Sequence, residues 1–268
     1  MDGNVRLAND RAQVEVDLTR GGRISSLVVD GWSLLVGPSD DDLAWGAYVM
    51  APWAGRVRDG RFSFDGLEHQ LPRRTGEHAL HGTVLDRQWE QLDVGRLRTP
   101  LGASWPWSGS IEHQLDLDED GLTLELTLSS DSEAFPASMG WHPWFLRRIT
   151  KGGAHADLDL DVQPVDAWDV DAELIPTGVI GPAPGPPWDT PFDSLARAPV
   201  LRWPGALDLS ILSDVACWVI YSEPEHAVCV EPQTARPDAL SLVDVAVVRP
   251  GAPLTASCRL AWSAPAGG

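Results

Sequence analysis

Four polar side chains stand in otherwise apolar, aromatic or proline-marked segments of this chain. Arg56 follows a glycine and precedes a strand-like stretch, and His81 belongs to a His-Gly pair. His142 lies among three aromatic residues, and Glu231 ends an apolar run. Imidazoles and carboxylates are common general acids and bases, and an apolar environment shifts the pKa of an imidazole. These residue types indicate proton-transfer chemistry.

Other common catalytic motifs are missing from the sequence. It has no glycine-rich phosphate loop, no dinucleotide fingerprint and no Gly-x-Ser-x-Gly nucleophile elbow. His78 and His81 suggest a metal, but residues three apart on an extended chain point to opposite faces, and no third ligand lies near them in the sequence. We therefore predict no metal site.

The charge balance disfavours two classes of partner. The 268 residues include 20 basic and 39 acidic side chains, a formal net charge of -19, which repels nucleic-acid phosphates and anionic lipid headgroups. No apolar run reaches the roughly 18 to 20 residues of a membrane span. The first residues lack the basic and apolar segments of a secretory signal. We expect no nucleic-acid or membrane partner and a cytoplasmic location.

The cysteines and tryptophans are expected to be mostly buried. Cys217, Cys229 and Cys258 are an odd number without metal-ligand spacing, so buried free thiols are a better interpretation than disulfides or a zinc ribbon. The chain has 13 tryptophans, whose flat rings can stack on a sugar, but for any one of them packing between sheets is the favoured interpretation.

The elements that must position the polar side chains are strands. Apolar residues alternate with polar ones, the period of a half-buried strand, at residues 14–18, 122–128, 157–162 and 258–262. Turns between such runs are supplied by Asp-Gly pairs at 30–31, 59–60, 65–66 and 120–121. No segment has amphipathic helical spacing over three turns. The sequence therefore predicts an all-β, mostly antiparallel sandwich.

The Pro/Gly-rich stretch 181–187 resembles an interdomain linker in composition. The period-two pattern is the same on both of its sides, and β-sandwiches of more than 200 residues are common as one domain. We interpret the stretch as a long surface loop and predict a single domain over residues 1–268.

In this order and roughly at this spacing, the four polar segments resemble the aldose 1-epimerase family, the galactose mutarotases. Residues 174–178 and 188–192 add two further matches, to a Pro-Thr-Gly turn and an Asp-containing segment. The resemblance spans nearly the whole chain. It implies a galactose mutarotase-like β-supersandwich with an open sugar cleft, which agrees with the fold predicted from periodicity.

The resemblance also implies a role for each residue. Glu231 would be the general base that takes the proton of the anomeric O1 hydroxyl, and His142 the general acid at the ring oxygen O5. His81 would hydrogen-bond near the reacting oxygens, while Arg56 and Asp189 would hold sugar hydroxyls. No cofactor is implied, and the partner is a small-molecule sugar.

The chemistry of a hemiacetal requires such a pair, because ring opening removes a proton from O1 while O5 gains one. After rotation about C1–C2, the same two groups work in reverse to close the opposite anomer. For these roles Glu231 must be ionised at neutral pH, which a nearby Arg56 favours, and the pKa of His142 should stay near 7.

Two positions depart from the family pattern or leave a choice. The family often has Asn immediately before the arginine, where this chain has Gly55. Asp193 lies four residues after Asp189 in the same segment and is the alternative sugar-binding aspartate. On the residues alone, His142 is also compatible with a hydrogen-bonded core histidine, and Glu231 with a structural ion pair.

Three other functions remain open. A hexose-6-phosphate epimerase would use the same chemistry with a cationic phosphate pocket, for which Arg73, Arg74, Arg147 and Arg148 are the candidates. A noncatalytic sugar-binding module would use tryptophan faces and a carboxylate without proton transfer. A glycosidase would need paired carboxylates, and no two acids stand out as a pair in the sequence.

Overall fold

Strands dominate the computed structural model, which describes residues 3–74, 76–215, 217–242 and 244–265. Helical backbone in them is confined to two short 3-10 turns, η1 (Arg58–Gly60) and η2 (Ala239–Ser241). Among the described residues, no helical segment has the length and apolar character needed to cross a membrane. The all-β prediction is confirmed.

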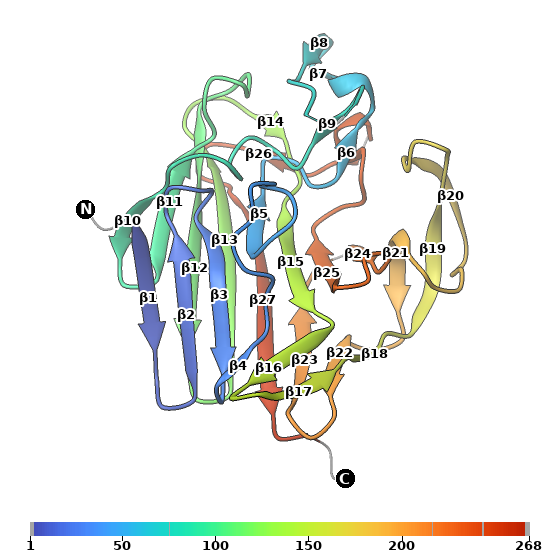
Figure 1. Cartoon of the computed structure of the whole chain (residues 1–268). Helices are drawn as coiled ribbons and strands as arrows, with labels where there is room; N and C mark the ends of the chain where they lie inside the picture. Colours follow the sequence, from blue (N-terminus) through green and yellow to red (C-terminus); the bar gives the residue numbers. More distant parts are fainter. Residues whose placement is uncertain (1–2, 75, 216, 243, 266–268) are drawn as a thin grey trace.

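Two large antiparallel sheets pack against each other (Figure 1). The larger sheet has eleven strands, with β4 paired to β3 beside the main path. In spatial order they are β1 (Asn4–Ala8), β2 (Ala12–Asp17), β3 (Arg23–Val29), β5 (Ala47–Met50), β15 (Gly140–Leu146), β25 (Ala227–Gln233), β24 (Cys217–Tyr221), β21 (Asp189–Leu195), β19 (Pro164–Val170) and β20 (Pro176–Pro182), with β4 at Trp32–Ser33.

The second sheet has eight strands, and four two-stranded ribbons complete the fold. The eight strands, in spatial order, are β10 (Glu90–Asp93), β11 (Arg96–Pro100), β12 (Gly109–Leu117), β13 (Gly121–Ser130), β27 (Leu254–Ser263), β23 (Leu207–Ser213), β22 (Val200–Trp203) and β18 (Asp159–Asp161). The ribbons are β6 (Arg56–Val57) with β9 (Ala79–Leu80), β7 (Arg61–Phe64) with β8 (Leu67–Gln70), β14 (Phe135–Pro136) with β26 (Val247–Val248), and β16 (Arg148–Lys151) with β17 (Ala154–Asp157).

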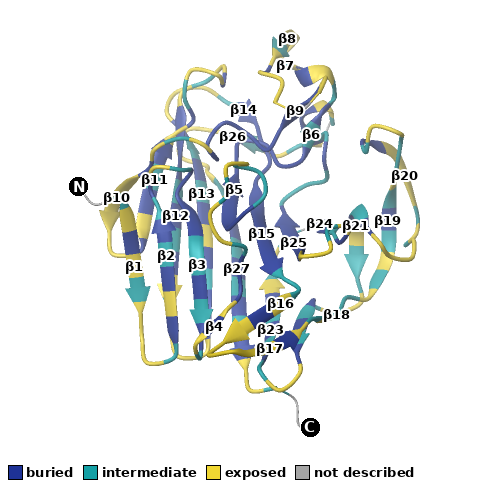
Figure 2. Cartoon of the chain, viewed as in Figure 1, coloured by how far each residue is buried: buried dark blue, intermediate teal, exposed yellow. Residues whose placement is uncertain are grey.

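Three central strands of the larger sheet, β5, β15 and β25, are buried on both faces (Figure 2). Because side chains alternate across a strand, each strand contributes to two different environments. On β25, Val228 and Val230 join the core between the sheets, whereas Ala227 and Cys229 belong to a separate apolar cluster on the opposite face. That opposite face carries the polar residues discussed below.

Three of the four predicted strands form as single strands. Residues 122–128 lie within β13, residues 258–262 lie within β27, and residues 14–18 overlap β2. The prediction of one strand over residues 157–162 is wrong, because this stretch is divided between β17 and β18. The two pieces pair with different partners, β16 and β22.

The stretch at residues 181–187 is only partly a loop. Its first two residues end strand β20, and residues 183–187 form no strand or helix. The prolines and glycine of this shorter loop are largely exposed, as expected for a surface connection.

Glycine is required in the Asp-Gly pairs for two different structural reasons. At 30–31, 59–60 and 65–66 both residues have positive φ, the left-handed backbone of tight turns. The pair at 120–121 differs, because Gly121 has no positive φ and begins β13. A Cβ there would lie 2.6 Å from the Arg259 guanidinium carbon, so the missing side chain leaves space for that arginine.

The expectations for tryptophan and cysteine are confirmed. Of the 13 tryptophans, Trp107 and Trp168 are half-buried and the other eleven are buried. All three cysteines are free and buried.

A buried histidine links the two sheets. His113 on β12 of the second sheet accepts a hydrogen bond from the indole Nε1 of Trp141 on β15 of the larger sheet, at 3.2 Å. His113 is fully buried, and burial lowers its pKa from 6.5 to about 3. The imidazole is therefore neutral in the folded protein over the pH range in which an unfolded histidine becomes charged.

We expect His113 to contribute to acid destabilisation. Its pKa is lower in the folded chain, so the unfolded chain binds the proton more strongly, and the free energy of unfolding falls as the pH drops from 6.5 toward 3. The slope contributed by one such group is at most about 1.4 kcal/mol per pH unit. His113→Gln keeps an acceptor for Trp141 without titrating, and urea unfolding of this variant between pH 7 and 4 should show a shallower slope.

His155→Gln is the matched control, since His155 is exposed on β17 and should leave the slope as in the wild type. Equal slopes for His113→Gln and the wild type would contradict the assignment.

Candidate active site

A cleft of about 260 Å³ lies on the face of the larger sheet that carries the polar residues. Its walls include all five residues that the sequence singled out, Arg56, His81, His142, Asp189 and Glu231. They are separated by up to 175 positions in the chain, between Arg56 and Glu231. The fold therefore brings the predicted site residues together, while their roles remain predictions.

Five neighbouring strands form the floor of the cleft, and each contributes side chains from the same face of the sheet. The contributing residues are Tyr48 on β5, His142 and Trp144 on β15, Glu231 and Gln233 on β25, Val219 and Tyr221 on β24, and Asp189 and Pro191 on β21. Arg56 and His81 reach the cleft from the β6/β9 ribbon and its end.

His142 and Glu231 are in direct contact. The Nε2 atom of His142 lies 3.2 Å from Oε1 of Glu231. The two strands are antiparallel, and the pairing of Trp144 with Cys229 two residues along places His142 opposite Glu231. The second carboxyl oxygen of Glu231 accepts a hydrogen bond from the Gln233 amide at 3.0 Å. Strand register and one amide thus orient both reactive groups.

Two aromatic rings hold the His142 imidazole. The Tyr48 ring is stacked on it at a centroid distance of 4.7 Å, and the Trp144 ring lies nearly parallel at 5.6 Å. The register pairs Tyr48 directly with His142 across β5 and β15. The imidazole is buried with only its cleft edge accessible, so its orientation is fixed by packing.

Burial shifts the pKa values of Glu231 and His142 in opposite directions. It raises the pKa of Glu231 well above its usual value, and the Asp189 charge adds to the rise, while the Gln233 hydrogen bond and Arg56 oppose it. Burial lowers the pKa of His142 to about 3. The expected pKa near 7 for His142 is therefore wrong for this cleft, and Arg56 does not outweigh the burial of Glu231. The directions indicate a net neutral pair, with the carboxyl protonated and the imidazole neutral.

His81 presents a defined tautomer to the cleft. Its Nδ1 accepts a hydrogen bond from the Gly55 backbone N–H at 3.3 Å, so a neutral ring carries its proton on Nε2 and is a donor there. Burial lowers the pKa of His81 well below 6.5, and the His142 and Arg56 charges act in the same direction. The His81 ring meets His142 edge-on at a centroid distance of 5.1 Å.

The corner that carries His81 needs glycine on two sides. His81 itself has a φ of 58°, a left-handed conformation that costs about 1 to 3 kcal/mol for a non-glycine residue. A Cβ on Gly82 would lie 1.9 Å from the Ala51 carbonyl oxygen. Gly55 has a φ of 69° and lies against Pro237. A Cβ on Gly55 would lie 2.8 Å from the Pro237 Cβ, so glycine rather than the family's frequent Asn suits this position in this chain.

Arg56 and Asp189 complete the polar lining. Among the described residues, the Arg56 guanidinium makes no hydrogen bond or ion pair with the protein, so its donors face the cleft freely. Burial raises the pKa of Asp189, and Arg56 opposes that rise. Asp193, the alternative aspartate, is exposed and lies in a separate hollow beside Ser194. Of the two aspartates, Asp189 is therefore the one in the cleft.

Sequence reasoning did not single out Gln233, Tyr48 and Tyr221. Gln233 was detectable, because it follows Glu231 by two residues and period two puts both on one face of a strand. Tyr48 and Tyr221 reach the site through strand pairing with His142 and Asp189, and local sequence carries no signal for that.

One group of side chains in the described chain could hold a metal ion. Donor atoms of His142, Cys229 and Glu231 lie within 4.8 Å of one another, and all three residues are buried. The sequence prediction considered His78 instead, whose Nδ1 accepts a hydrogen bond from the Asp59 N–H at 3.1 Å.

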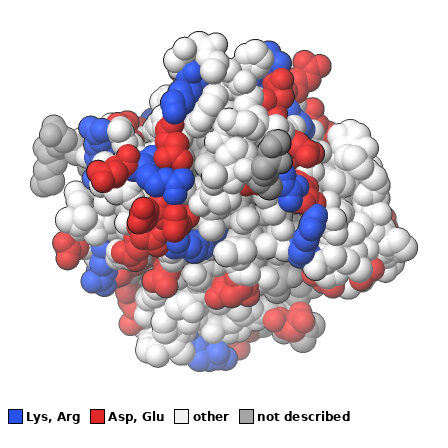
Figure 3. Space-filling view, turned by 90° about the horizontal axis from the view of Figure 1, so that it is seen from below, with Lys and Arg blue, Asp and Glu red and all other residues white. Residues whose placement is uncertain are grey.

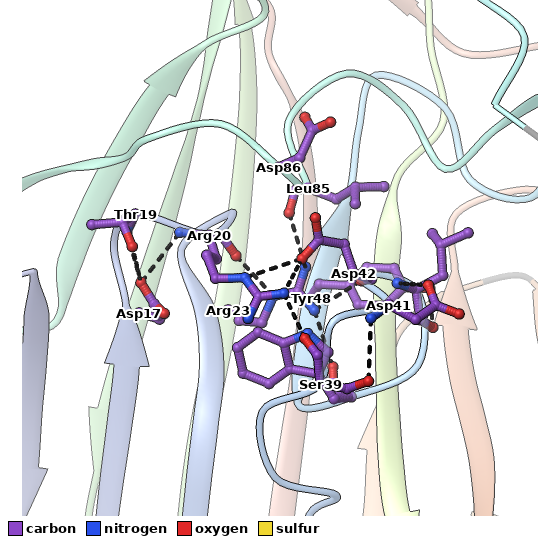
Figure 4. A network of polar contacts seen from close by, with 12 residues as sticks. Asp17, Thr19, Arg20, Arg23, Ser39, Asp41, Asp42, Tyr48, Leu85 and Asp86 are labelled. Atoms are coloured by element: carbon purple, nitrogen blue, oxygen red, sulfur yellow. Dashed lines mark hydrogen bonds and ion pairs between the residues drawn. The ribbon is translucent and has the colours of Figure 1, made fainter.

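An irregular segment, residues 36–46, forms one wall of the cleft and contributes Asp41, Leu43 and Ala44. Hydrogen bonds from Arg23 hold its backbone. The Arg23 guanidinium donates to the carbonyl oxygens of Asp42 and Trp45 at 2.8 and 3.2 Å (Figure 4).

The same guanidinium also reaches beyond the wall. It donates to the Arg20 and Leu85 carbonyl oxygens at 2.8 and 3.0 Å and lies 4.2 Å from the Trp45 ring centroid. Arg23 is fully buried, and burial lowers its pKa to about 10, so it stays charged at neutral pH. Arg23 thus adds to the backbone hydrogen bonds at the two ends of this wall, where Val36 and Gly46 bond to Trp144 and to each other.

Charge elsewhere on the molecule is mixed. On the face drawn in Figure 3, basic side chains lie beside acidic ones. Ion pairs also hold Arg148 to Asp157 and Arg202 to Asp161, both at 2.6 Å.

Comparison with known proteins shows which family the chain is similar to. The family model described as aldose 1-epimerase matches residues 4–240. Among curated proteins, the uncharacterized protein YihR of Escherichia coli is 25% identical over 146 residues, covering 50% of this chain and 47% of YihR. Galactose mutarotase of Rattus norvegicus is 28% identical over 180 residues, covering 63% of this chain and 52% of that protein. The chain thus spans about half the length of these relatives.

Among solved structures, a galactose mutarotase-like protein from Clostridium acetobutylicum superposes with a TM-score of 0.82. The match covers 97% of this chain and 94% of that chain at 17% sequence identity. The predicted galactose mutarotase-like fold is confirmed.

Arg23→Met should loosen the cleft wall. The variant leaves several buried carbonyl groups without a donor, and we expect a loss of about 3 kcal/mol or more in the free energy of unfolding. Hydrogen exchange should rise first in residues 36–46. Arg96→Met is the control, since Arg96 is exposed and pairs with Glu112 at the surface, where we expect a change below about 1 kcal/mol. Unchanged exchange in residues 36–46 would contradict this role for Arg23.

Proposed function

Because this chain belongs to the aldose 1-epimerase family, we propose that it interconverts the α and β anomers of a free aldohexose such as glucose or galactose. The observation that supports this most directly is the 3.2 Å contact between His142 and Glu231 at the floor of the cleft. Anomer exchange needs one proton-transfer group at O1 and one at O5, the two oxygens bonded to the anomeric carbon. A carboxyl and an imidazole in register on adjacent strands meet that requirement.

The proton count of the pair fits the reaction. In the ring-opening step, Glu231 as carboxylate takes the O1 proton while His142 as imidazolium gives a proton to O5. This leaves a neutral carboxyl and a neutral imidazole, the form that burial favours. Ring closure on the other face of the aldehyde returns both protons. Both forms of the pair hold the same number of protons, so the cycle never places net charge on the pair.

The neighbouring residues have positioning roles in this proposal. The Nε2–H of His81 can donate to sugar oxygens as charge develops, and its lowered pKa keeps the ring neutral. The free guanidinium of Arg56 donates to sugar hydroxyls, and Asp189 accepts from them. Trp144 and Tyr221 supply apolar surface beside the sugar.

A free sugar is favoured over a sugar phosphate. Among the described residues that line the cleft, Arg56 is the only lysine or arginine, against Asp41, Asp189 and Glu231. The four arginines considered for a phosphate pocket are engaged elsewhere. Arg73 pairs with Glu77, Arg74 with Asp86 and Arg148 with Asp157, and Arg147 donates to backbone carbonyls at Ser222, Pro224 and Ala227.

The remaining alternatives are less well supported. A noncatalytic sugar-binding module does not require an imidazole in contact with a buried carboxyl. The cleft does contain two carboxyls, Asp189 and Glu231, which sequence reasoning did not pair, but the second group in contact with Glu231 is His142. A cofactor-free reaction, a single domain over residues 1–268 and a cytoplasmic location remain predictions from the sequence.

Glu231→Gln and His142→Asn should abolish most of the activity. Fresh α-D-glucose and α-D-galactose, followed by polarimetry, should reach anomeric equilibrium faster with the wild type than without protein. Loss of one proton-transfer group should lower kcat by about 10²- to 10⁴-fold.

Glu225→Gln and His155→Asn, both exposed and outside the cleft, are the matched controls. If the protein speeds the anomeric equilibration of glucose 6-phosphate but of neither free sugar, the substrate is a sugar phosphate rather than a free sugar. Full activity of Glu231→Gln would refute the pair mechanism.

Asp189→Asn should weaken sugar binding more than catalysis. A hydrogen bond to a charged group contributes about 1.5 to 3 kcal/mol, so KM should rise by roughly 10- to 100-fold with a smaller change in kcat. Asp193→Asn, in the exposed hollow, should leave KM unchanged. The opposite pattern would assign sugar binding to Asp193.

A further inference from the structure

Cys229 lies beside the proposed catalytic pair without a role in the mechanism. It precedes Glu231 by two residues on β25 and therefore points to the same face of the sheet. Its thiol forms no disulfide and is fully buried, next to the ring-bearing residues Tyr48 and Trp144 of the cleft-side apolar cluster.

We propose that Cys229, His142 and Glu231 form an inhibitory binding site for a thiophilic divalent cation, with Zn²⁺ as the preferred ion. The proposal rests on the proposed function for its effect on activity, but not for the binding itself. The three donors are one sulfur, one nitrogen and one carboxylate oxygen, all within 4.8 Å of one another. This donor set is common at zinc sites and disfavours Mg²⁺ and Ca²⁺, which prefer oxygen ligands alone.

The spacing is close to that of a tetrahedral site. Zinc lies about 2.0 to 2.3 Å from such donors, so two donors of one ion are about 3.3 to 3.7 Å apart. The 3.2 Å separation of His142 Nε2 and Glu231 Oε1 is already close to this range. The thiol must approach by roughly 1 Å at most, a change that a cysteine side chain can make by rotation about one bond.

The proposed metal site is open on the side that faces the cleft. His142 and Glu231 line the cleft, so an ion can reach them from solvent, and a water molecule on the open side can complete the coordination in the space that the sugar would occupy. The carboxylates of Asp41 and Asp189 in the cleft walls, against the one Arg56 cation, favour the approach of a divalent ion.

Binding of the ion would remove the groups that the reaction needs. A cation coordinated by an imidazole nitrogen and a carboxylate oxygen occupies the lone pairs that accept the sugar protons. The thiol and the protonated carboxyl release their protons to solvent on binding, and no electron is transferred. Zinc and sugar should therefore compete, and the enzyme needs no metal for turnover.

The chain supplies a matched control for the thiol. Cys258 is also free and buried, but it lies on β27 in the second sheet, away from any group of three donors found in the described residues.

The test combines a spectrum with an inhibition series, using protein freed of metal with a chelator. Co²⁺ added to the wild type should give a near-ultraviolet thiolate-to-cobalt charge-transfer band at one ion per chain. Cys258→Ala should keep the band, and Cys229→Ala and Cys229→Ser should lose it. In polarimetry, Zn²⁺ should raise the apparent KM for the sugar without lowering kcat, and either Cys229 variant should weaken this inhibition by at least about tenfold relative to its own zinc-free rate.

The outcomes separate this proposal from the proposed function. Absence of the cobalt band in the folded wild type overturns the site whatever the activity. Equal zinc inhibition of wild type and both Cys229 variants, or equal inhibition by Mg²⁺, also overturns it. Loss of activity on chelation, restored by Zn²⁺, overturns the inhibitory role. If no mutarotation is found but the cobalt band depends on Cys229, the proposed function fails and the metal site stands.

Discussion

A carboxyl and an imidazole held 3.2 Å apart and away from water are the constraint on which the rest of this structure depends. Burying either charge alone costs several kcal/mol, so the two groups must be adjacent, correctly oriented and hydrogen-bonded. Adjacent antiparallel strands provide the first condition through register, the flanking Tyr48 and Trp144 rings provide the second, and the Gln233 amide provides the third. This explains why β15 and β25 are buried on both faces although only one face contacts the second sheet.

The open side of the pair is built by irregular backbone, which has other physical requirements. His81 has a left-handed backbone conformation. It lies between the β6/β9 ribbon and Gly82, where any Cβ would collide with Ala51. The opposite wall, residues 36–46, forms no strand. The buried Arg23 guanidinium donates to its Asp42 and Trp45 carbonyl oxygens, and Arg20 donates to that of Ser39. Regular strands therefore hold the proposed proton-transfer groups, while loops held by glycine and arginine shape the cleft that we propose receives the sugar.

Much of the fold was predictable because a sheet with one buried face has a local signature, and β13 and β27 show it over many residues. The stretch at 157–162 has the same alternation and still divides into two strands, since alternation cannot reveal a change of partner. Arg56, His81, His142 and Glu231 were predictable one by one, as polar side chains in apolar segments, whereas Asp189 was predicted from the family resemblance alone. Their electrostatics were not, because the burial that lowers the pKa of His142 to about 3 comes in part from Tyr48 and from strands distant in sequence, in addition to the neighbouring Trp144.

Burial of the pair also limits which substrates suit the cleft. Anomer exchange of a free sugar begins and ends with neutral species, and the pair can follow it by moving protons without acquiring net charge. A phosphorylated sugar would bring about two negative charges toward two or three carboxyl groups, with Arg56 as the only cationic side chain among the described lining residues. These charges would add to the effect of Asp189, which already raises the pKa of Glu231. A buried, net neutral pair in the proposed role therefore fits a neutral substrate.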